Sequence, residues 1–259
     1  MIREVEAKSI LRRHKRIDSW FLGGFGLNLY RGCAHNCAYC DGRSENYQVE
    51  GEFGRDIAVK TNALSLLERE LDPARKRKPL PAGYLLIGGG VCDAYQPAEE
   101  SYRLARGTLE LALRYGYPVH ILTKSVLVER DIDLIEEINR KNRAIVSFSF
   151  SSADSRVSGV FEPGVPPPER RLEAIRRMKG AGISCGMFLM PVIPFVTDTP
   201  EMIAETLRQG KEAGIDFCIF GSMTLKAGRQ REHFLGTLRR HYPEIEPRYD
   251  EIYSPDSRW

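Results

Sequence analysis

The sequence predicts an α/β fold in which six strands alternate with helices, as in an incomplete (β/α)6 barrel of the TIM type. From Leu27 onward, short apolar runs alternate with longer amphipathic runs. The longer runs carry apolar residues three and four positions apart, which is the period of a helix. A doubly wound open sheet would show the same alternation, so periodicity leaves both architectures open. In either one, chemistry gathers at the carboxyl ends of the strands.

The individual elements follow from this alternation. We expect strands at 27–30, 84–87, 119–123, 144–150, 184–190 and 217–220. We expect helices at 62–71, 98–115, 131–141, 168–179, 200–212 and 229–241. Asp131 and Thr199 occupy N-cap positions, Pro200 suits a first helical turn, and Gly214 stands where a helix should end.

Length and composition are those of an ordinary globular protein. The 259 residues fit one large domain or two small ones, and 42% are hydrophobic while 28% are charged. The formal net charge of +3 is too small to indicate a nucleic-acid partner. We divide the chain into an N-terminal extension (1–26), a partial barrel (27–241) and a C-terminal tail (242–259), to which we assign no structure.

Nothing in the sequence indicates a membrane or an export route. The first six residues lack the apolar region of a signal peptide. The most apolar stretch, 183–196, is short and is interrupted by Pro191 and Pro194. We therefore expect a cytoplasmic protein whose thiols stay reduced, with no membrane partner.

Three of the six cysteines, Cys33, Cys37 and Cys40, lie within eight residues directly after the first predicted strand. Soft thiolates suit iron, and three of them can hold a four-iron cluster while one iron stays open. Zinc would need a fourth ligand, either His35 or a distant cysteine, and the spacing disfavours both. We expect His35 to be exposed or to lie behind the metal ligands.

The Cys-x₃-Cys-x₂-Cys arrangement, with Tyr39 before the last cysteine, resembles the signature of the radical S-adenosylmethionine (SAM) superfamily. Further blocks resemble its spore photoproduct lyase-like branch: Leu29 to Cys33, Cys92 to Pro97, Leu122 to Ser125 and Phe161 to Pro163. The resemblance runs from about Leu27 to about His241.

This resemblance implies a partial barrel that binds a [4Fe–4S] cluster and SAM. Such an enzyme cleaves SAM reductively to a 5′-deoxyadenosyl radical, which abstracts hydrogen from a substrate; here the substrate is unknown, with a lyase reaction on nucleic acid as one option. A reductant such as flavodoxin or ferredoxin is expected as a partner. A non-enzymatic iron–sulfur or zinc protein, and a radical SAM modifier of a peptide or small molecule, remain alternatives.

The resemblance also implies roles in binding SAM. Tyr39 is expected near the adenine, the backbone of Gly88, Gly89 and Gly90 near the amine, and Lys124 near the carboxylate. Ser149 is a candidate for the methionine or ribose end. Asp93 either contacts cofactor or substrate, or caps a helix that begins near Pro97. The structural alternatives are a packing aromatic for Tyr39, a tight turn for the glycines and a solvated side chain for Lys124.

Cys92 is the candidate catalytic thiol. The hydrogen-donating cysteine of spore photoproduct lyase aligns with Gly90, two residues earlier, and this shift speaks against dimer repair. A shift of two along an extended segment keeps the same face, so Cys92 can still meet the substrate. Cys185 and Cys218 fall in predicted strands, and we assign both to packing.

A nucleic-acid substrate would require basic residues and stacking aromatic side chains. The basic candidates are Arg12, Arg13, Lys15, Arg16 and the run 75–78. The aromatic candidates are Tyr47, Phe53 and Tyr95. Runs of charge are more often solvated surface, and we take nucleic acid as one possibility among the substrates.

Overall fold

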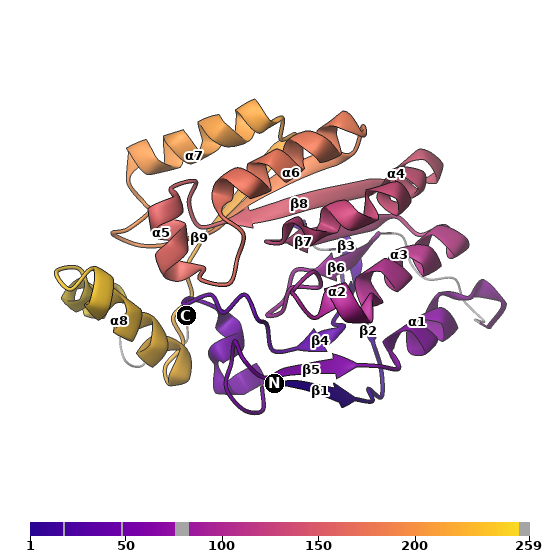
Figure 1. The fold of residues 1–259 in the computed structure, drawn as a ribbon, viewed down its shortest axis with the longest axis horizontal. Helices are drawn as coiled ribbons and strands as arrows, with labels where there is room; N and C mark the ends of the chain where they lie inside the picture. Colours follow the sequence, from indigo (N-terminus) through magenta and orange to yellow (C-terminus); the bar gives the residue numbers. More distant parts are fainter. Residues whose placement is uncertain (18, 48, 76–82, 254–259) are drawn as a thin grey trace.

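The computed structural model describes residues 1–17, 19–47, 49–75 and 83–253 and contains one large sheet of seven strands (Figure 1). Its order is β10-β9-β8-β7-β6-β3-β2. The strands are β2 (Leu11–Arg13), β3 (Gly23–Leu27), β6 (Tyr84–Gly88), β7 (Val119–Thr123), β8 (Ala144–Phe150), β9 (Ser184–Val192) and β10 (Phe217–Ser222). The six strands from β3 to β10 are mutually parallel, whereas β2 is antiparallel to β3. The sheet is not closed, which confirms the prediction of an incomplete six-stranded barrel.

A smaller sheet of order β1-β5-β4 lies beside the barrel. Its strands are β1 (Ile2–Val5), β4 (Tyr30–Arg31) and β5 (Ile57–Lys60). The strand predicted at 27–30 is therefore wrong in its bounds, because β3 ends at Leu27 and Tyr30 already belongs to β4. The start of β3 could not be predicted from residue propensities, because three of its five residues are glycine and glycine is depleted in strands.

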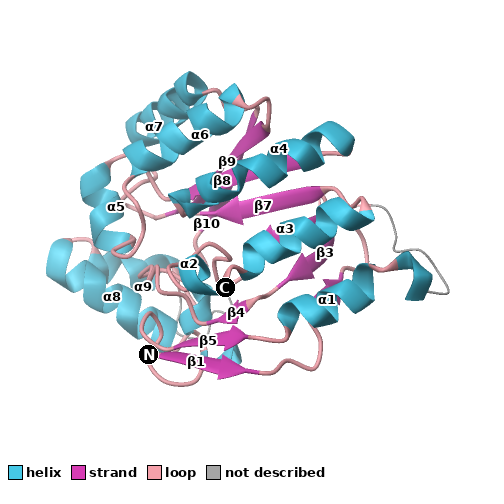
Figure 2. Cartoon of the chain, turned by 45° about the vertical axis from the view of Figure 1, so that its right-hand side comes forward, coloured by secondary structure: helices cyan, strands magenta, loops and turns pink. Residues whose placement is uncertain are grey.

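Helices cover the outer side of the large sheet, as Figures 1 and 2 show. The α-helices are α1 (Ala63–Leu71), α2 (Glu99–Tyr102), α3 (Leu104–Tyr115), α4 (Ile132–Lys141), α5 (Ser155–Phe161), α6 (Pro168–Gly180), α7 (Pro200–Ala213), α8 (Arg229–His241) and α9 (Tyr249–Ile252). Short 3-10 helices span Asp41–Arg43, Glu45–Tyr47, Pro73–Arg75, Val126–Asp131 and Glu246–Arg248.

The helix predicted at 98–115 is broken in two at Arg103, whose φ is 50°. The buried Glu99 explains the break, because its carboxylate accepts from the backbone N–H groups of Ala105 (2.9 Å) and Arg106 (3.2 Å). These are two of the unpaired donors at the start of α3. Glu99 thus caps the helix that follows its own.

The predicted caps have different outcomes. Thr199 accepts from the backbone N–H of Met202 and caps α7, which ends at Gly214 with φ 95°. Asp131 makes no capping hydrogen bond. Its buried carboxylate instead accepts from Arg106 (3.0 Å) and Arg130 (2.8 Å). Asp131 thus occupies the predicted N-cap position of α4, but its side chain is engaged by two guanidinium groups, whose charge-assisted bonds are stronger than a capping bond.

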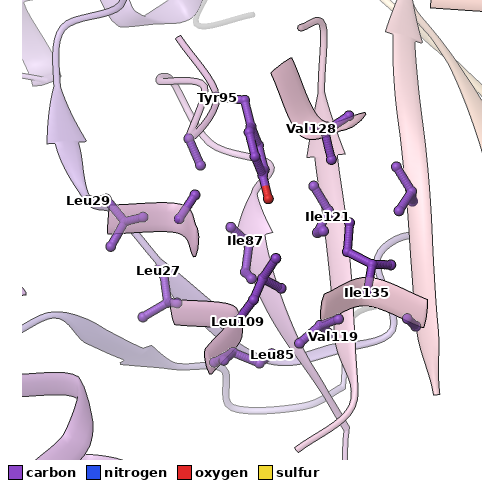
Figure 3. Packing of buried hydrophobic residues seen from close by; sticks show 14 of the residues in the cluster. Leu27, Leu29, Leu85, Ile87, Tyr95, Leu109, Val119, Ile121, Val128 and Ile135 are labelled. Carbon is purple, nitrogen blue, oxygen red and sulfur yellow. The ribbon is translucent and has the colours of Figure 1, made fainter. Parts of the chain in front are cut away.

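The main core lies between the sheet and the outer helices (Figure 3). Ile87 of β6 and Ile121 of β7 are fully buried there, together with Leu109 of α3 and Ile135 of α4. Burial of each such side chain contributes roughly 1.5–3 kcal/mol. This packing gives rigid support to the strand ends that carry the polar residues.

The described part of the C-terminal tail, residues 242–253, folds against the barrel, although we predict no structure for it from the sequence. The Tyr249 hydroxyl donates to Pro194 O and the Tyr253 hydroxyl to Met223 O, both at 2.6 Å. Both tyrosines belong to a second core cluster that also contains Cys37 and Tyr39. The tail therefore supports the cysteine loop. None of the described helices is long and apolar enough to cross a membrane.

Candidate functional site

A cavity of about 200 Å³ opens at the carboxyl ends of β6 to β9. All three cysteines of the triplet line it, together with most other residues singled out from the sequence: Tyr39, Gly89, Gly90, Cys92, Asp93, Lys124 and Ser149. Gly88 is not among the lining residues. A Cβ atom on Gly88 would lie 2.2 Å from Leu122 O, so the close approach of β6 to β7 requires a glycine at this position.

The cysteine loop turns tightly around the side chain of Arg43. Gly32 and Asn36 have φ values of 79° and 55°, and a Cβ atom on Gly32 would lie 2.4 Å from Asp56 O. Arg43 is buried and donates from Nε to Cys37 O and from Nη2 to Asn36 O, both at 3.1 Å. Asn36 O has no backbone donor among the described residues, so Arg43 satisfies it, whereas Cys37 O also accepts from the Cys40 N–H at 3.3 Å.

Two further side chains fix the start of the loop. Gln96 is fully buried; its Oε1 accepts from the Ala34 N–H (2.9 Å), and its Nε2 donates to Gly32 O (3.2 Å). His35 is 3% exposed, and its Nδ1 lies 3.3 Å from Asp93 Oδ2. His35 is therefore not exposed to solvent, and it lines the cavity beside the cysteines.

The cysteines of the loop are free thiols in a buried setting. Burial raises the pKa of Cys37 to about 12 and also raises the pKa values of Cys33 and Cys40. Protonated thiols release their protons when they bind a metal. Within the described ranges, no three His, Cys, Asp or Glu side chains are grouped as ligands of one metal ion.

Asp93 connects three segments of the chain. Its carboxylate accepts from the Tyr95 N–H (2.8 Å), the Thr123 hydroxyl (2.7 Å) and the Lys124 N–H (2.7 Å), in addition to its contact with His35. Burial acts to raise its pKa, but His35 and the hydrogen bonds outweigh burial and lower the pKa to about 2. Asp93 does not cap a helix near Pro97, because α2 begins at Glu99 with Ala98 as its N-cap.

Lys124 points into the cavity rather than into solvent. Its Nζ donates to Ser149 Oγ at 2.8 Å and lies 5.7 Å from the centre of the Tyr39 ring. The Ser149 hydroxyl in turn donates to Met190 O at 3.1 Å. The residues predicted after the third and fourth strands of the barrel are thus in direct contact.

A buried ionic network that sequence reasoning missed lies under Tyr39. The Tyr39 hydroxyl donates to Glu162, whose carboxylate also accepts from Arg171 (2.7 Å) and Ser158 (3.0 Å). Burial acts to raise the pKa of Glu162, and the charges of Arg171 and Lys124 outweigh it and lower the pKa. In the sequence, Glu162 is marked only by the block Phe161 to Pro163, which resembles the lyase-like branch but indicates no role for the carboxylate.

Residues near the C-terminus also reach the cysteine loop. Gln230 Nε2 donates to Tyr39 O (2.9 Å) and to Asp41 Oδ1 (3.0 Å). Lys226 Nζ donates to Asp41 Oδ2 at 2.7 Å. No pattern in the sequence links these residues to the triplet.

The aromatic floor of the cavity comes from Phe21 and Phe188, which stack with their centroids 5.2 Å apart. Below it, His120 Nδ1 lies 2.6 Å from Phe21 O, and Nε2 lies 2.8 Å from Ser147 Oγ. Burial lowers the pKa of His120, so the interior of the barrel beneath the cavity favours a neutral imidazole.

The three remaining cysteines lie in different environments: one lines the cavity, and two belong to or pack against the main core. Cys92 lines the cavity, and its Sγ lies 3.6 Å from Asn28 Oδ1. Cys185 is fully buried in the main core, and Cys218 packs against that core while partly buried, which agrees with the packing roles predicted for both.

The residues considered for nucleic-acid binding are scattered. Tyr95 is fully buried and cannot stack on a base, so that suggestion is wrong. Tyr47 is exposed, with Lys226 over its ring, and Phe53 packs against Arg43. The basic candidates Arg12, Arg13, Lys15 and Arg16 are exposed, whereas 76–78 lie outside the described residues.

Comparison with protein families finds a match to the model of the radical SAM superfamily over residues 27–208. An uncharacterised protein of Mycobacterium tuberculosis is 33% identical over 233 residues, which cover 88% of this chain and 67% of the relative. An uncharacterised protein of Methanocaldococcus jannaschii is 30% identical over 219 residues, which cover 84% of this chain and 76% of the relative.

Solved structures share the fold. Spore photoproduct lyase with bound AdoMet and dinucleoside spore photoproduct superimposes with a TM-score of 0.66 at 19% identity, over 94% of this chain and 66% of that chain. SuiB of Streptococcus suis bound to S-adenosylmethionine gives a TM-score of 0.57 at 16% identity, over 88% of this chain and 47% of that chain. The chain thus spans about two thirds of the lyase and less than half of SuiB.

We expect Asp93→Asn to lower the free energy of unfolding at pH 7 by on the order of 2 kcal/mol, because the carboxylate has a depressed pKa in the folded state. Stability from such a group is present above its unfolded pKa and is lost as pH falls toward its folded pKa. The advantage of the wild type should therefore be constant above about pH 4 and shrink between about pH 4 and 2.

Urea unfolding of both proteins at several pH values measures this difference. The control is Asp250→Asn, since the Asp250 side chain is 74% exposed, and little change is expected there. A difference between wild type and Asp93→Asn that stays the same down to pH 2 would contradict the role of the ionised carboxylate.

Proposed function

This chain belongs to the radical SAM superfamily, and we propose that it cleaves SAM reductively at a [4Fe–4S] cluster held by Cys33, Cys37 and Cys40. The observation that carries the proposal is that the three thiols line one cavity with Lys124 and the Gly89–Gly90 backbone. When bound, the cluster would supply the electron that converts SAM to methionine and the 5′-deoxyadenosyl radical, which takes a hydrogen atom from the substrate.

The donor set fits such a cluster. Thiolates are the ligands that iron–sulfur clusters use, and each of the three would bind a different iron. A tetrahedral zinc ion instead gathers its ligands around one centre. The three free thiols around a common cavity support the cluster, and the fourth iron is left for the amino and carboxylate groups of SAM.

The protein side chains suit the rest of SAM. Lys124 Nζ is held by the neutral Ser149 hydroxyl and has no carboxylate partner among the described residues, so it is available for the carboxylate of the cofactor. A Cβ atom on Gly90 would meet nothing within 4 Å, which leaves its backbone open to a ligand. Tyr39 O already accepts from Gln230, but a carbonyl has a second lone pair that could accept from the adenine amine.

The walls of the cavity orient these groups and limit water. Asp93 fixes the backbone of Lys124 and thereby the position from which its side chain extends. The stacked Phe21 and Phe188 form an apolar floor. We assign Asp93 the role of holding the Lys124 backbone in place beside the cofactor, without taking part in the reaction itself.

For the substrate, we propose nucleic-acid material and a lyase type of reaction. The likeness in fold to spore photoproduct lyase, which is seen with a dinucleoside spore photoproduct, supports this choice. A flavodoxin or ferredoxin would supply the electron. A cytoplasmic location fits the six free cysteines, because a reducing compartment preserves both thiols and cluster.

The test of the function is anaerobic reconstitution with iron and sulfide, followed by dithionite and SAM. We expect 5′-deoxyadenosine from the wild type and neither cluster nor product from Cys37→Ala, because two thiolates cannot hold the cubane. The matched control is Cys218→Ala, because Cys218 is a partly buried cysteine of β10 that does not line the cavity. This variant should keep both the cluster and the production of 5′-deoxyadenosine. A fully loaded wild type that makes no deoxyadenosine would refute the proposal.

Lys124→Ala should leave the cluster in place and weaken SAM binding by about 10- to 100-fold, the range expected for loss of a hydrogen bond to a charged group. Equilibrium binding of SAM to the reconstituted protein measures this, with the exposed Lys211→Ala as control. Unchanged affinity in Lys124→Ala would remove this residue from the SAM site.

We propose that Cys92 faces the substrate and is not a fourth cluster ligand. Its thiol lies in the cavity, where it could donate a hydrogen atom to a substrate radical. We expect Cys92→Ala to keep its iron content and the change that SAM causes in the EPR spectrum of the reduced cluster. If SAM altered the spectrum of Cys92→Ala but not that of the wild type, Cys92 would be the ligand that closes the cluster.

A further inference from the structure

The small sheet turns one face away from the core, and that face is basic. Ile57 and Val59 of β5 are buried toward the core, so Ala58 and Lys60 point to the opposite side. Pairing places Arg3 of β1 and Arg31 of β4 on either side of Ala58. With Lys8, which follows β1, the residues Arg3, Arg31 and Lys60 make up what we call the basic face.

This face is hollowed. A cavity of about 500 Å³ is lined by all four cations of the basic face and by Ala58, whose methyl group forms a low floor between the two arginines. Strands lie about 4.8 Å apart, so the two arginine stems rise roughly 10 Å from one another across the middle strand. That spacing leaves room for a ligand between them.

The positive charge of the face is only partly neutralised. Arg3 pairs with Glu50 at 2.6 Å, but the side chains of Arg31 and Lys8 make no hydrogen bond or ion pair to any residue that the structure describes. Arg31 acts on Glu50 only through its charge. Glu6 and Glu50 are the two carboxylates that border the cavity, against four cations. Burial lowers the pKa of Lys60; Cys92 opposes this shift, and the positive charge of the nearby Arg31 adds to it.

The basic face adjoins the cavity of the cysteines. Arg31 is separated from Cys33 only by Gly32. Lys60 Nζ donates to Asn28 O at 2.5 Å, and the Asn28 side chain lies 3.6 Å from the thiol of Cys92, which lines the catalytic cavity. A ligand bound along the basic face would therefore have one end next to Cys92, at the opening through which the reacting part of a substrate would enter the cavity of the cysteines.

We propose that the basic face binds the phosphodiester backbone of the substrate while the reacting nucleotide occupies the cavity. The assignment of the substrate rests on the proposed function, whereas the anion-binding surface does not. A phosphodiester strand presents repeated charges, which match cations set along a face. An extended acidic peptide would also need pockets for alternate side chains, and the floor here is Ala58 and Val5.

The experiment is fluorescence anisotropy of a labelled twelve-residue oligo-dT with the reconstituted protein across a series of salt concentrations. Arg31→Ala and Lys8→Ala should each weaken binding by about 5- to 10-fold at low salt and reduce the slope of log affinity against log salt by about 0.7, the value for one contact to a single strand. The matched controls are Arg176→Ala on α6 and Lys211→Ala on α7, both exposed and distant from the small sheet (Figure 1), and they should stay within about twofold of the wild type.

Equal losses in the control variants, or no loss in Arg31→Ala and Lys8→Ala, would overturn the proposal. A glutamate peptide of the same charge that competes as well as unlabelled oligo-dT would also overturn it in favour of a general anion surface. Because Arg31 is near Cys33, its variant is compared at equal iron content, and Lys8→Ala gives the same test away from the loop.

The production of deoxyadenosine separates this inference from the proposed function. Wild type that makes deoxyadenosine but does not bind oligo-dT refutes the basic face alone. Wild type that binds oligo-dT through Arg31 and Lys8 but makes no deoxyadenosine refutes the proposed function and leaves the surface standing.

Discussion

The buried carboxylate of Asp93 is the contact on which the geometry of the site depends. It joins the cysteine loop through His35 to the end of β7 through Thr123 and the Lys124 backbone. Isolated, a buried carboxylate would be neutral, but these donors stabilise its charge. One anion thus fixes the relative positions of the proposed metal-binding loop and the lysine proposed for the cofactor, two elements about 90 residues apart in sequence.

A second buried carboxylate, Glu162, acts on the other side of Tyr39. It is fully paired with Arg171, Ser158 and the tyrosine hydroxyl, and the same arginine donates to Ser149 O at 2.5 Å. The charge of Lys124 acts on Glu162 without a direct ion pair, and its ammonium group donates only to the Ser149 hydroxyl among the described residues. In a medium of low polarisability, an ammonium group without an ion-pair partner attracts an entering carboxylate more strongly than it would in water.

The sequence predicted those parts of the site that follow a local rule. Strand β7 is a short apolar run; the strand-end rule and the resemblance to the superfamily together pointed to Asp93, Lys124 and Ser149, and all three line the cavity. Glu162 and Gln230 escaped prediction because the contact of each with Tyr39 spans a long stretch of chain, 123 residues for Glu162 and 191 for Gln230. Arg171 lies in a run of charged residues, which by itself predicts a solvated surface. The break of the helix at Arg103 could not be predicted either. It depends on the contacts of the Glu99 carboxylate with the start of α3, and the apolar periodicity of the sequence does not indicate those contacts.

The small sheet would add the proposed substrate surface to the barrel. The family match begins at residue 27, and β1 lies before it. Arg3 stands beside Ala58 only because β1 adds to β5 in parallel register, and Lys8 is placed by the same addition. The barrel is the part shared with the superfamily and would supply the setting for the proposed cleavage of SAM, whereas loops and strands at its rim would select what approaches. A row of cations that combines a strand outside the matched region with Arg31 and Lys60 inside it is therefore where substrate preference would be expected to reside.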